Sequence, residues 1–408
     1  MDLDVGFVPV GRPGHGGPGS VQTSSLLIRE MSKYFNLTIY VISNESVERD
    51  HLPAKERVDY VIRDGLNITP HPLHNKMKEV SSLIPQLKSH DLIHSYCSEY
   101  IKQLSVIDTP TLVTLNSYRP ICPKEDLRYL NKKKCSGPSM TKCISCVTRS
   151  AVDRSQGFKG ELKSYYTSIY QLNLSRETIE SKRDITSYHA LSPHLKQDYE
   201  SLGFPGTSIK VIPHFYNEQF YQPKQSANIN QKSPTILSVG RLEEKKGVQT
   251  LIESIPKMKS MGYQPSVKIV GDGSYERKLH SLAESLNVEQ EIEWLGFVDY
   301  NELPDIYSSS DLFVYPGLWD EPFGRVFLEA LASQLPIVAS NVGSVEYIIG
   351  DAGRTFVPGV SEDLASKFDS LIQDYEYHYN SIGDELSRFK RERIIDKFRK
   401  HYRKVATH

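Results

Sequence analysis

Long hydrophobic runs are missing from this sequence. No stretch approaches the roughly 18 consecutive apolar residues of a membrane-spanning helix. The first residues, MDLDVGFVPVGRPG, also lack the basic segment and following apolar run of a secretory leader. We therefore expect a soluble, cytoplasmic protein.

Net charge is nearly absent as well. The 49 basic and 50 acidic side chains almost cancel, which excludes the broad positive surface of a dedicated nucleic-acid binder. Local excesses remain, because residues 121–183 carry 13 Lys or Arg against six Asp or Glu, and residues 387–408 carry nine against two. We interpret both as solvated faces. The alternative is peripheral binding to an anionic surface at the cytoplasmic face of a membrane.

Cysteine is scarce, and five residues do not indicate a secreted disulfide framework. Four of them nevertheless lie within 25 residues, the last two spaced C-x2-C: Cys122, Cys135, Cys143 and Cys146. Such spacing lets thiolates converge on one tetrahedral metal, which favours structural zinc. Buried thiols without a metal, an iron–sulfur cluster and disulfides are the alternatives. Cys97 stands apart and is interpreted as a small core residue.

The composition and the order of patterns favour two α/β domains. A chain of 408 residues exceeds the usual size of a single core. Buried-strand patterns alternate with helical ones in each half, which is typical of parallel sheets covered by helices. The polar, basic, cysteine-bearing stretch of about 120–183 interrupts this rhythm and is interpreted as an insertion. The strands are predicted at 5–10, 37–43, 91–96, 111–116, 188–192, 209–213, 235–240, 266–271, 292–297, 312–317 and 336–340.

The domain boundaries follow from this alternation. We expect a first domain over 1–216, a polar linker over 217–233 and a second domain over 234–386. The two domains face each other, and the cleft between them is the expected ligand site.

Two glutamates eight positions apart, Glu321 and Glu329, flank a predicted strand-to-helix turn. Gly324 allows close backbone approach there, and the free amides of the first helical turn favour an anion such as a diphosphate. Glu329, about one turn into the helix, is suited to accept hydrogen bonds from vicinal hydroxyls, as on a ribose. A solvated position for Glu329 is the alternative, which the apolar run VFLEALA disfavours.

The segment SVGRLEEKKG supplies a cationic complement. It follows a predicted strand and opens a helix, so Arg241 and Lys246 carry charges suited to a leaving diphosphate. An ordinary surface ion pair with Glu243 or Glu244 is the alternative.

These segments, together with IVGDG, LFVYPGLWDEPFG and LEALASQLPIVASNVGS, resemble the retaining nucleotide-sugar glycosyltransferases of family four, which have the glycosyltransferase-B fold of two facing Rossmann-like domains. The resemblance implies that Glu321 contacts the donor sugar and Glu329 the ribose. It implies that Arg241 and Lys246 bind the diphosphate, so that catalysis needs no metal cofactor. The remaining donor-binding positions that it implies are Phe323, Gly324, Arg325, Gly240 and Gly271.

The activity implied by the resemblance is hexosyltransferase-type. A sugar passes with retention from a nucleotide-diphosphate donor to a glycan, lipid-linked or similar hydroxyl acceptor, and the leaving phosphate helps to deprotonate the acceptor. A covalent role for Glu321 is the disfavoured alternative. Two other functions stay open, namely a nucleotide-sugar epimerase on the same fold and a metal-stabilised scaffold that has lost catalysis.

The same resemblance makes the first half the acceptor domain and residues 387–408 a helix that crosses back onto it. That helix would pack through Ile395, Phe398, Tyr402 and Val405. Asn116-Ser117 stands where many relatives have His-Asp, and Gln334 and Ser344 replace common glycines.

On the acceptor side we expect Asn116 and a loop that contains His15, Gly16 and Gly17. The G-x-G-x-x-G pattern of this loop also matches a dinucleotide-binding turn, which Pro18 disfavours. His94 is expected to point toward the cleft on this side, and for both His94 and His15 a structural role is favoured over a catalytic one.

Overall fold

The computed structural model describes residues 3–15, 19–68, 71, 73–130, 133–154, 158–221 and 229–407. The chain divides into two compact units. The first comprises residues 1–213 and 394–408, and the second comprises residues 214–393.

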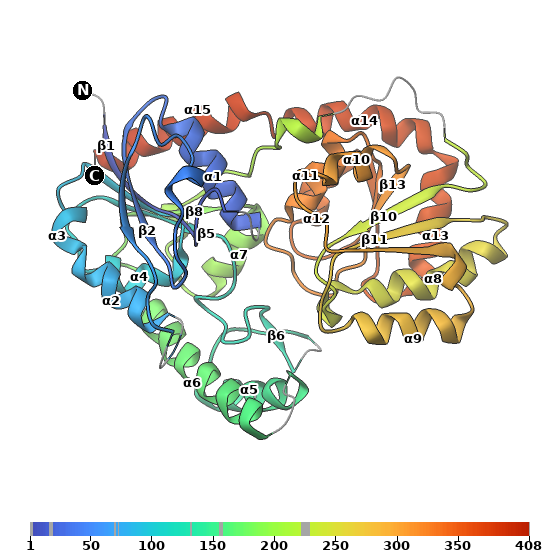
Figure 1. The fold of residues 1–408 in the computed structure, drawn as a ribbon, viewed down its shortest axis with the longest axis horizontal. Helices are drawn as coiled ribbons and strands as arrows, with labels where there is room; N and C mark the ends of the chain where they lie inside the picture. The colour runs from blue at the N-terminus through green and yellow to red at the C-terminus, as the bar shows by residue number, and fades with distance from the viewer. Residues whose placement is uncertain are drawn as a thin grey trace. The chain divides into compact units, whose positions relative to one another are not determined.

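The first unit is built on a seven-stranded parallel sheet with the order β3-β2-β1-β4-β5-β8-β9 (Figure 1). The parallel sheet and its hydrophobic strands were predicted. Strand β3 was not, because it is half-exposed and lacks a buried apolar run. The bounds are β1 (Asp4–Val8), β2 (Asn36–Ile42), β3 (Asp59–Arg63), β4 (Leu92–Ser95), β5 (Thr111–Leu115), β8 (Ser187–Ala190) and β9 (Ile209–Val211).

Helices cover this sheet. Helix α1 buries Val21, Leu27, Ile28 and Met31. Helix α7 begins at a proline and is capped by Ser192, whose hydroxyl accepts a hydrogen bond from the Leu195 amide. The bounds are α1 (Gly19–Met31), α2 (His74–Ser82), α3 (Ile84–Leu87), α4 (Ile101–Leu104) and α7 (Pro193–Ser201).

The last helix, α15 (Arg391–Ala406), contributes its residues from Ile394 onward to the first unit. The packing face expected from the sequence is confirmed, because Ile395, Phe398, Tyr402 and Val405 are all buried. The apolar face of the helix is therefore covered by the protein itself, and the basic side chains of the helix occupy its other positions.

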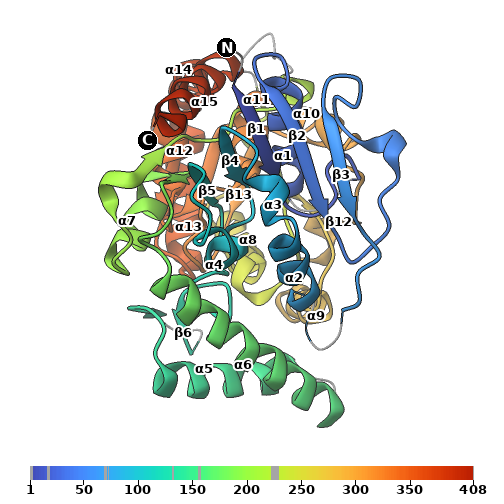
Figure 2. The same cartoon turned by 90° about the vertical axis from the view of Figure 1, so that its left-hand side faces the viewer.

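The insertion lies between two strands that are neighbours in the sheet, since β5 pairs directly with β8. It contains the antiparallel pair β6 (Arg128–Tyr129) and β7 (Lys133–Lys134), followed by helices α5 (Met140–Arg154) and α6 (Phe158–Glu180). The two helices lie side by side (Figure 2). An ion pair of 2.6 Å between Lys134 Nζ and Asp198 ties the insertion to α7.

The second unit has a six-stranded parallel sheet with the order β12-β11-β10-β13-β14-β15. Each unit is therefore an α/β layer structure of the Rossmann-like type, as predicted. Strand β15 was missed because it is short, lies at the sheet edge and carries Arg354. The bounds are β10 (Thr235–Val239), β11 (Ser266–Val270), β12 (Ile292–Gly296), β13 (Leu312–Tyr315), β14 (Ile337–Ser340) and β15 (Gly353–Phe356).

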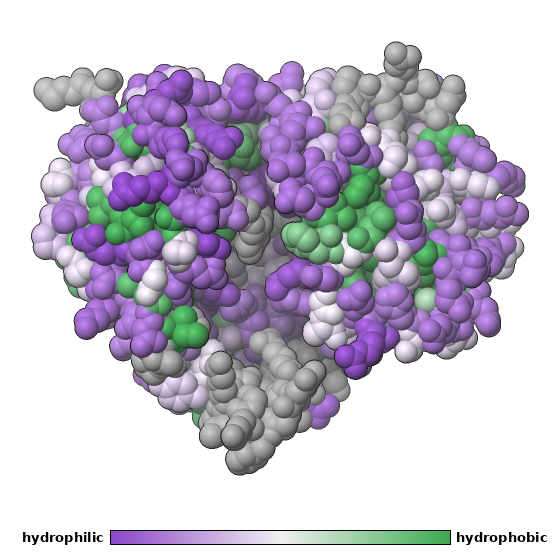
Figure 3. All heavy atoms as spheres, viewed as in Figure 1, coloured by the Kyte–Doolittle hydropathy of each residue, from purple (hydrophilic) through white to green (hydrophobic). Residues whose placement is uncertain are grey.

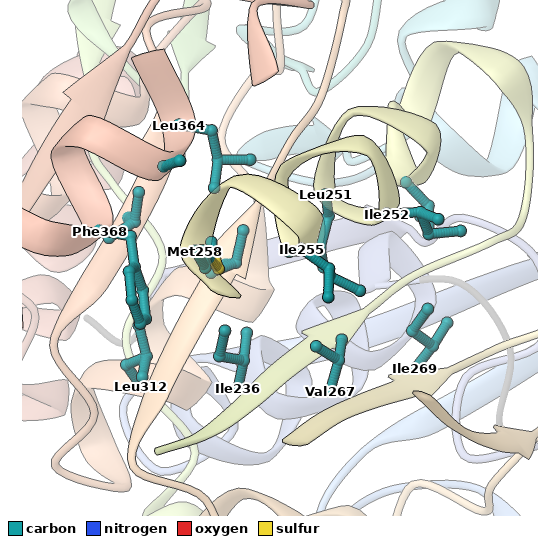
Figure 4. Close-up of a cluster of buried hydrophobic side chains, with 14 of the residues drawn as sticks. Ile236, Leu251, Ile252, Ile255, Met258, Val267, Ile269, Leu312, Leu364 and Phe368 are labelled. Carbon is teal, nitrogen blue, oxygen red and sulfur yellow. The ribbon is translucent and has the colours of Figure 1, made fainter. Parts of the chain in front are cut away.

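Helix α8 (Val248–Ser260) covers part of this sheet with its apolar side chains. Its predicted apolar positions are all buried, and they pack on β10 and β11 beside helix α13 (Ser361–Gln373), as Figure 4 shows. Each such side chain contributes about 1.5–3 kcal/mol when it leaves water. The other helices of the unit are α9 (Glu276–Leu286), α10 (Leu303–Ser308), α11 (Arg325–Ala332), α12 (Val345–Ile349) and α14 (Tyr375–Ser387).

The linker predicted over 217–233 is wrong for its described residues. Phe220 is fully buried in the second unit, and its carbonyl accepts a hydrogen bond of 3.2 Å from the Ser333 hydroxyl. Ile229 packs against the core of the same unit. Aromatic anchoring is what makes this polar segment part of a domain.

Within the described part of the chain, no helix combines the length and hydropathy needed to cross a bilayer. The face shown in Figure 3 is mainly hydrophilic, with separate hydrophobic patches on each unit.

Candidate functional site

The candidate site lies in the second unit, where the loops after β10, β11 and β13 meet. Gly240 donates its amide to the Val270 carbonyl at 3.0 Å. Gly271 has a φ of +127°, and a Cβ there would stand 2.0 Å from the Gly240 carbonyl oxygen. Gly271 therefore permits a close backbone crossing over Gly240. A small pocket beside them is lined by Gly240, Arg241, Lys246, Tyr315 and Pro316, among others.

The central contact of the site is an ion pair between two predicted residues. The Lys246 ammonium lies 2.9 Å from Oε2 of Glu321, and both side chains are mostly buried, with exposed fractions of 19% and 13%. Lys246 ends a short 3-10 turn, Glu244–Lys246, and Gly247 follows with a φ of +73°. A Cβ at Gly247 would stand 1.8 Å from the Pro316 carbonyl oxygen, so glycine is required to bring this turn against β13.

Two aromatic side chains that the sequence analysis missed hold this pair. The Tyr315 hydroxyl donates to Oε2 of Glu321 at 2.7 Å, and the Trp319 indole donates to the Tyr315 oxygen at 3.3 Å. Lys246 Nζ lies 4.9 Å from the centre of the Trp319 ring, within cation–π range. Burial and the neighbouring Glu321 raise the pKa of Tyr315, which therefore stays a hydrogen-bond donor.

Arg241 stands at the mouth of the site. Its side chain is 69% exposed and pairs with Glu243 at 2.8 Å, while Glu243 also contacts Lys245 at 3.2 Å. The ion-pair alternative is thus realised for Arg241. Since exposed ion pairs contribute little, the guanidinium can exchange Glu243 for an anionic ligand.

Glu329 lies inside the unit, with 4% of its surface exposed. Tyr300 and Tyr307 each donate a hydroxyl to its carboxylate at 3.2 Å, and Arg325 Nε lies 3.6 Å away. Burial raises the pKa of Glu329, and Arg325 and the two hydroxyls oppose that shift. The alternative of a solvated Glu329 is therefore wrong. The sequence analysis did not single out Tyr300 and Tyr307. They lie seven residues apart in the segment just before β13.

Two side chains predicted to bind the donor serve other purposes. Phe323 is 1% exposed and packs edge-on against His214, with 4.7 Å between ring centres. Apolar packing buries this side chain, and a donor contact by Phe323 stays a prediction. Arg325 is directed toward Tyr300, to which it donates at 2.7 Å, and so positions Glu329.

The loop that carries Glu321 is fastened by the segment after β14. The Ser344 hydroxyl donates to the carbonyls of Glu321 and Phe323 at 3.0 and 3.1 Å, and the Gly343 amide donates to Asp320 at 3.2 Å. Ser344, one of the departures from the family pattern, thus anchors the loop. Gly324 has a φ of +81° where the loop enters α11.

The acceptor-side predictions fall in the first unit and are not gathered in one place. His94 is fully buried, with one ring nitrogen 2.5 Å from the Tyr402 hydroxyl and the other 2.7 Å from Thr114 Oγ1. The prediction that it faces an acceptor is wrong, because it belongs to the core under α15. Burial lowers its pKa.

Asn116 and His15 hold loops. The Asn116 amide donates to the Tyr96 carbonyl at 2.9 Å and accepts from Ser98 at 3.3 Å, which links the ends of β4 and β5. His15 accepts the Glu48 amide at 2.8 Å. Gly16 and Gly17 lie outside the described residues.

Comparisons with known proteins agree with this site. Residues 221–385, which include Lys246, Glu321, Glu329 and the tyrosines that donate to the two carboxylates, match the family model described as Glycosyl transferases group 1. The second unit is thus similar to the group 1 glycosyl transferases over residues 221–385. An uncharacterized glycosyltransferase of Methanocaldococcus jannaschii is 31% identical over 225 residues, 51% of this chain and 56% of that protein. The N-acetyl-alpha-D-glucosaminyl L-malate synthase of Bacillus anthracis is 26% identical, over 56% of this chain and 62% of that protein.

A solved structure shares the fold of this chain over its whole length. The Anabaena protein HepE, solved with UDP and glucose, covers 98% of this chain and 99% of its own, with a TM-score of 0.68 and 18% identity. The fold is therefore the predicted glycosyltransferase-B type. By sequence, the matched region spans only part of the curated relatives, with 56%, 37% and 62% of their lengths covered in three of them.

Proposed function

We propose that the protein transfers a hexosyl group from a nucleotide-diphosphate sugar to a hydroxyl acceptor, with retention of anomeric configuration. The observation that carries the proposal is the 2.9 Å pair of Lys246 and Glu321, fastened at the carboxyl edge of a parallel sheet. Open α/β sheets bind their ligands at this edge. Arg241, a second cation in the same pocket lining, adds to it.

The cations explain how a leaving diphosphate is stabilised. Cleavage of the sugar–phosphate bond places negative charge on the phosphate oxygens, and in this proposal Lys246 and Arg241 neutralise it. Lys246 is the preorganised member because Glu321 and Trp319 hold it. Arg241 is the exposed member, and it exchanges its contact with Glu243 for a phosphate. These two charges take the role that a metal ion has in other transferases.

Glu321 supplies orientation. In the described part of the chain, its contacts with Lys246 and Tyr315 both use Oε2, so Oε1 is suited to accept hydrogen bonds from hydroxyls of the donor sugar. In the retaining route, the leaving phosphate accepts the proton of the acceptor hydroxyl while the new glycosidic bond forms on the same face. Glu321 then needs no covalent role.

Glu329 is the proposed ribose contact. Its buried carboxylate already accepts two tyrosine hydroxyls, and a ribose hydroxyl would add to them or replace one. The Anabaena structure with UDP supports a nucleoside diphosphate as the ligand class.

Thermal unfolding with a panel of nucleoside diphosphates and nucleotide sugars tests the donor site. Binding to the folded state raises Tm by mass action, so one nucleotide should raise Tm in the wild type and not in Glu329→Ala. Glu376→Ala is the control, because Glu376 lies in the first turn of α14 outside the site. No shift with any nucleotide would favour the scaffold alternative.

Product analysis distinguishes the remaining alternative. A transferase hydrolyses its donor slowly and forms a glycoside only when an acceptor is present, whereas an epimerase converts the nucleotide sugar without one. The comparisons lend the epimerase no support.

For the acceptor we propose a glycan or a lipid-linked hydroxyl compound, presented at an anionic membrane surface. The basic excess of the insertion and of α15 is the basis for the surface. Pelleting with anionic and neutral vesicles tests it, and equal binding to both would contradict it.

A further inference from the structure

The chain between Cys122 and Cys135 has an unusual backbone. Glu125, Leu127 and Leu130 have φ values of 68°, 51° and 50°, and they are three of the six non-glycine residues with positive φ among the described residues. A left-handed conformation costs a side-chain-bearing residue about 1–2 kcal/mol. Three left-handed residues within six positions persist only where the surrounding structure imposes that conformation.

Main-chain amides in this segment point at cysteine sulfurs. The Leu130 amide donates to Cys146 Sγ at 3.3 Å, and the Ser139 amide donates to Cys143 Sγ at 3.4 Å. The turn after Cys122 brings the amides of Lys124, Asp126 and Leu127 onto the Cys122 sulfur. Hydrogen bonds from main-chain amides to sulfur are contacts that orient cysteine ligands around a metal.

Hydrogen bonds join the turn to the other segments that carry the cysteines. Cys143 and Cys146 lie on one face of α5 three positions apart, the Leu130 amide of the turn donates to Cys146 Sγ, and the Cys135 amide donates to the Leu127 carbonyl at 2.7 Å. Cys122, Cys143 and Cys146 are less than a tenth exposed, and Cys135 is partly buried. All are free thiols, so the disulfide alternative is not realised.

We propose that Cys122, Cys135, Cys143 and Cys146 bind one zinc ion through four thiolates. Binding releases the proton of each thiol that is not already ionised. The four-thiolate centre carries a net charge of −2, and the basic excess of the insertion, 13 Lys or Arg against six Asp or Glu over residues 121–183, compensates it. The turn that contains Glu125, Leu127 and Leu130 is then the loop that surrounds the first ligand, Cys122.

The cysteine sulfurs stand farther apart than the ligands of a closed zinc site, so zinc binding requires them to move closer. No three cysteine sulfurs of the described chain lie within 4.8 Å of one another. Bonds of about 2.3 Å in a tetrahedron put sulfurs about 3.8 Å apart, so the metal draws them closer and cross-links α5 to the turn and to the segment after β7. The centre thereby fastens the helical pair α5 and α6 to the first unit.

Metal analysis of the full chain, purified without added metal or chelator, tests the proposal. We expect about one zinc per chain, released stoichiometrically when a mercurial titrates the thiols. Cys143→Ser and Cys146→Ser should lose the zinc, whereas Cys97→Ser, which changes the buried cysteine outside the insertion, should retain it.

A second measurement does not depend on the folding of the variants. Wild-type protein exchanged with cobalt should show the absorption bands of tetrahedral thiolate coordination, and added zinc should remove them. Substoichiometric zinc in the wild type together with no cobalt bands would overturn the proposal. So would iron in place of zinc, or full zinc retention by both Cys143→Ser and Cys146→Ser.

Discussion

The Lys246 ammonium and the Glu321 carboxylate meet at 2.9 Å across 75 residues of sequence. Neither segment by itself fixes the position of its residue, because Lys246 ends a short turn after β10 and Glu321 lies in the loop after β13. Strands β10 and β13 are adjacent in the sheet, and that adjacency makes the contact. A paired cation and carboxylate, mostly out of water, form the fixed part of the site.

Removal of either partner should reduce transfer strongly. We expect Lys246→Ala and Glu321→Gln each to lower kcat by about 100-fold to 1,000-fold, since each removes a preorganised charge or hydrogen-bond acceptor at the reacting phosphate or sugar. The control is Lys257→Ala, which breaks a 2.9 Å surface ion pair with Glu362 and should leave kcat unchanged. Equal losses in the control and the site variants would mean that general stability is being measured.

Tyr315→Phe isolates the aromatic support of Glu321. The change deletes the 2.7 Å hydrogen bond and keeps the ring, so kcat should fall about tenfold, as expected for about 1–1.5 kcal/mol. Tyr263→Phe removes a comparable 2.6 Å bond to Asp369 far along the sequence and should not change kcat. An unchanged kcat in Tyr315→Phe would show that Lys246 alone fixes Glu321.

Gln334 occupies a left-handed conformation at the end of α11, with φ of 59°. Glycine adopts this conformation without the steric cost, so Gln334→Gly should raise the free energy of unfolding by about 0.5–1 kcal/mol. Denaturant titration measures it, with Gln334→Ala as the matched control that should give no gain. A destabilised glycine variant would show that the Gln334 side chain makes a needed contact.

Acid should destabilise the first unit through its buried histidines. Burial lowers the pKa of His189 to about 3 and of His401 to about 4. An unfolded chain has ordinary histidines with a pKa of about 6.5, so it binds more protons and stability falls as pH drops from about 6.5 toward these values. His401 contacts the Ser187 hydroxyl at 3.2 Å, and His401→Gln should flatten the fall of Tm in mild acid. An identical pH profile for the variant would contradict this assignment.

Glu329 should show the opposite sign. Because burial raises its pKa, the ionised carboxylate weakens folding once the pH exceeds the unfolded value, and the penalty is complete above the folded pKa. The Tm difference between Glu329→Gln and wild type should therefore favour the variant more at neutral pH than in mild acid. The comparison is Glu362→Gln, since Lys257 lowers the pKa of Glu362 and its contribution is instead lost in acid.

Several features could be predicted because their signals are local. Hydrophobic strands of both sheets, the amphipathic faces of α8 and α15, and the glycine turn before α11 follow from periodicity and backbone freedom within a few residues. Glu321, Lys246 and Glu329 were recognisable because their spacing belongs to a strand–loop–helix unit. Strands β3 and β15 are half-exposed and lack a buried apolar run, so hydrophobic periodicity did not predict them.

Tertiary structure decided what each polar side chain touches. His94 has the sequence context of a site residue, yet α15, joined from the far end of the chain, covers it with Tyr402. Tyr300 lies in the turn before α10 and Tyr307 on α10, and neither position marks a site in the sequence, yet both hydroxyls reach Glu329 on α11. Sequence by itself determined the elements and the charges that the site uses, because helix, strand and turn preferences act between near neighbours. Strand order and helix packing determined which of those charges meet, because burial, hydrogen bonding and pKa depend on residues that are close only in space.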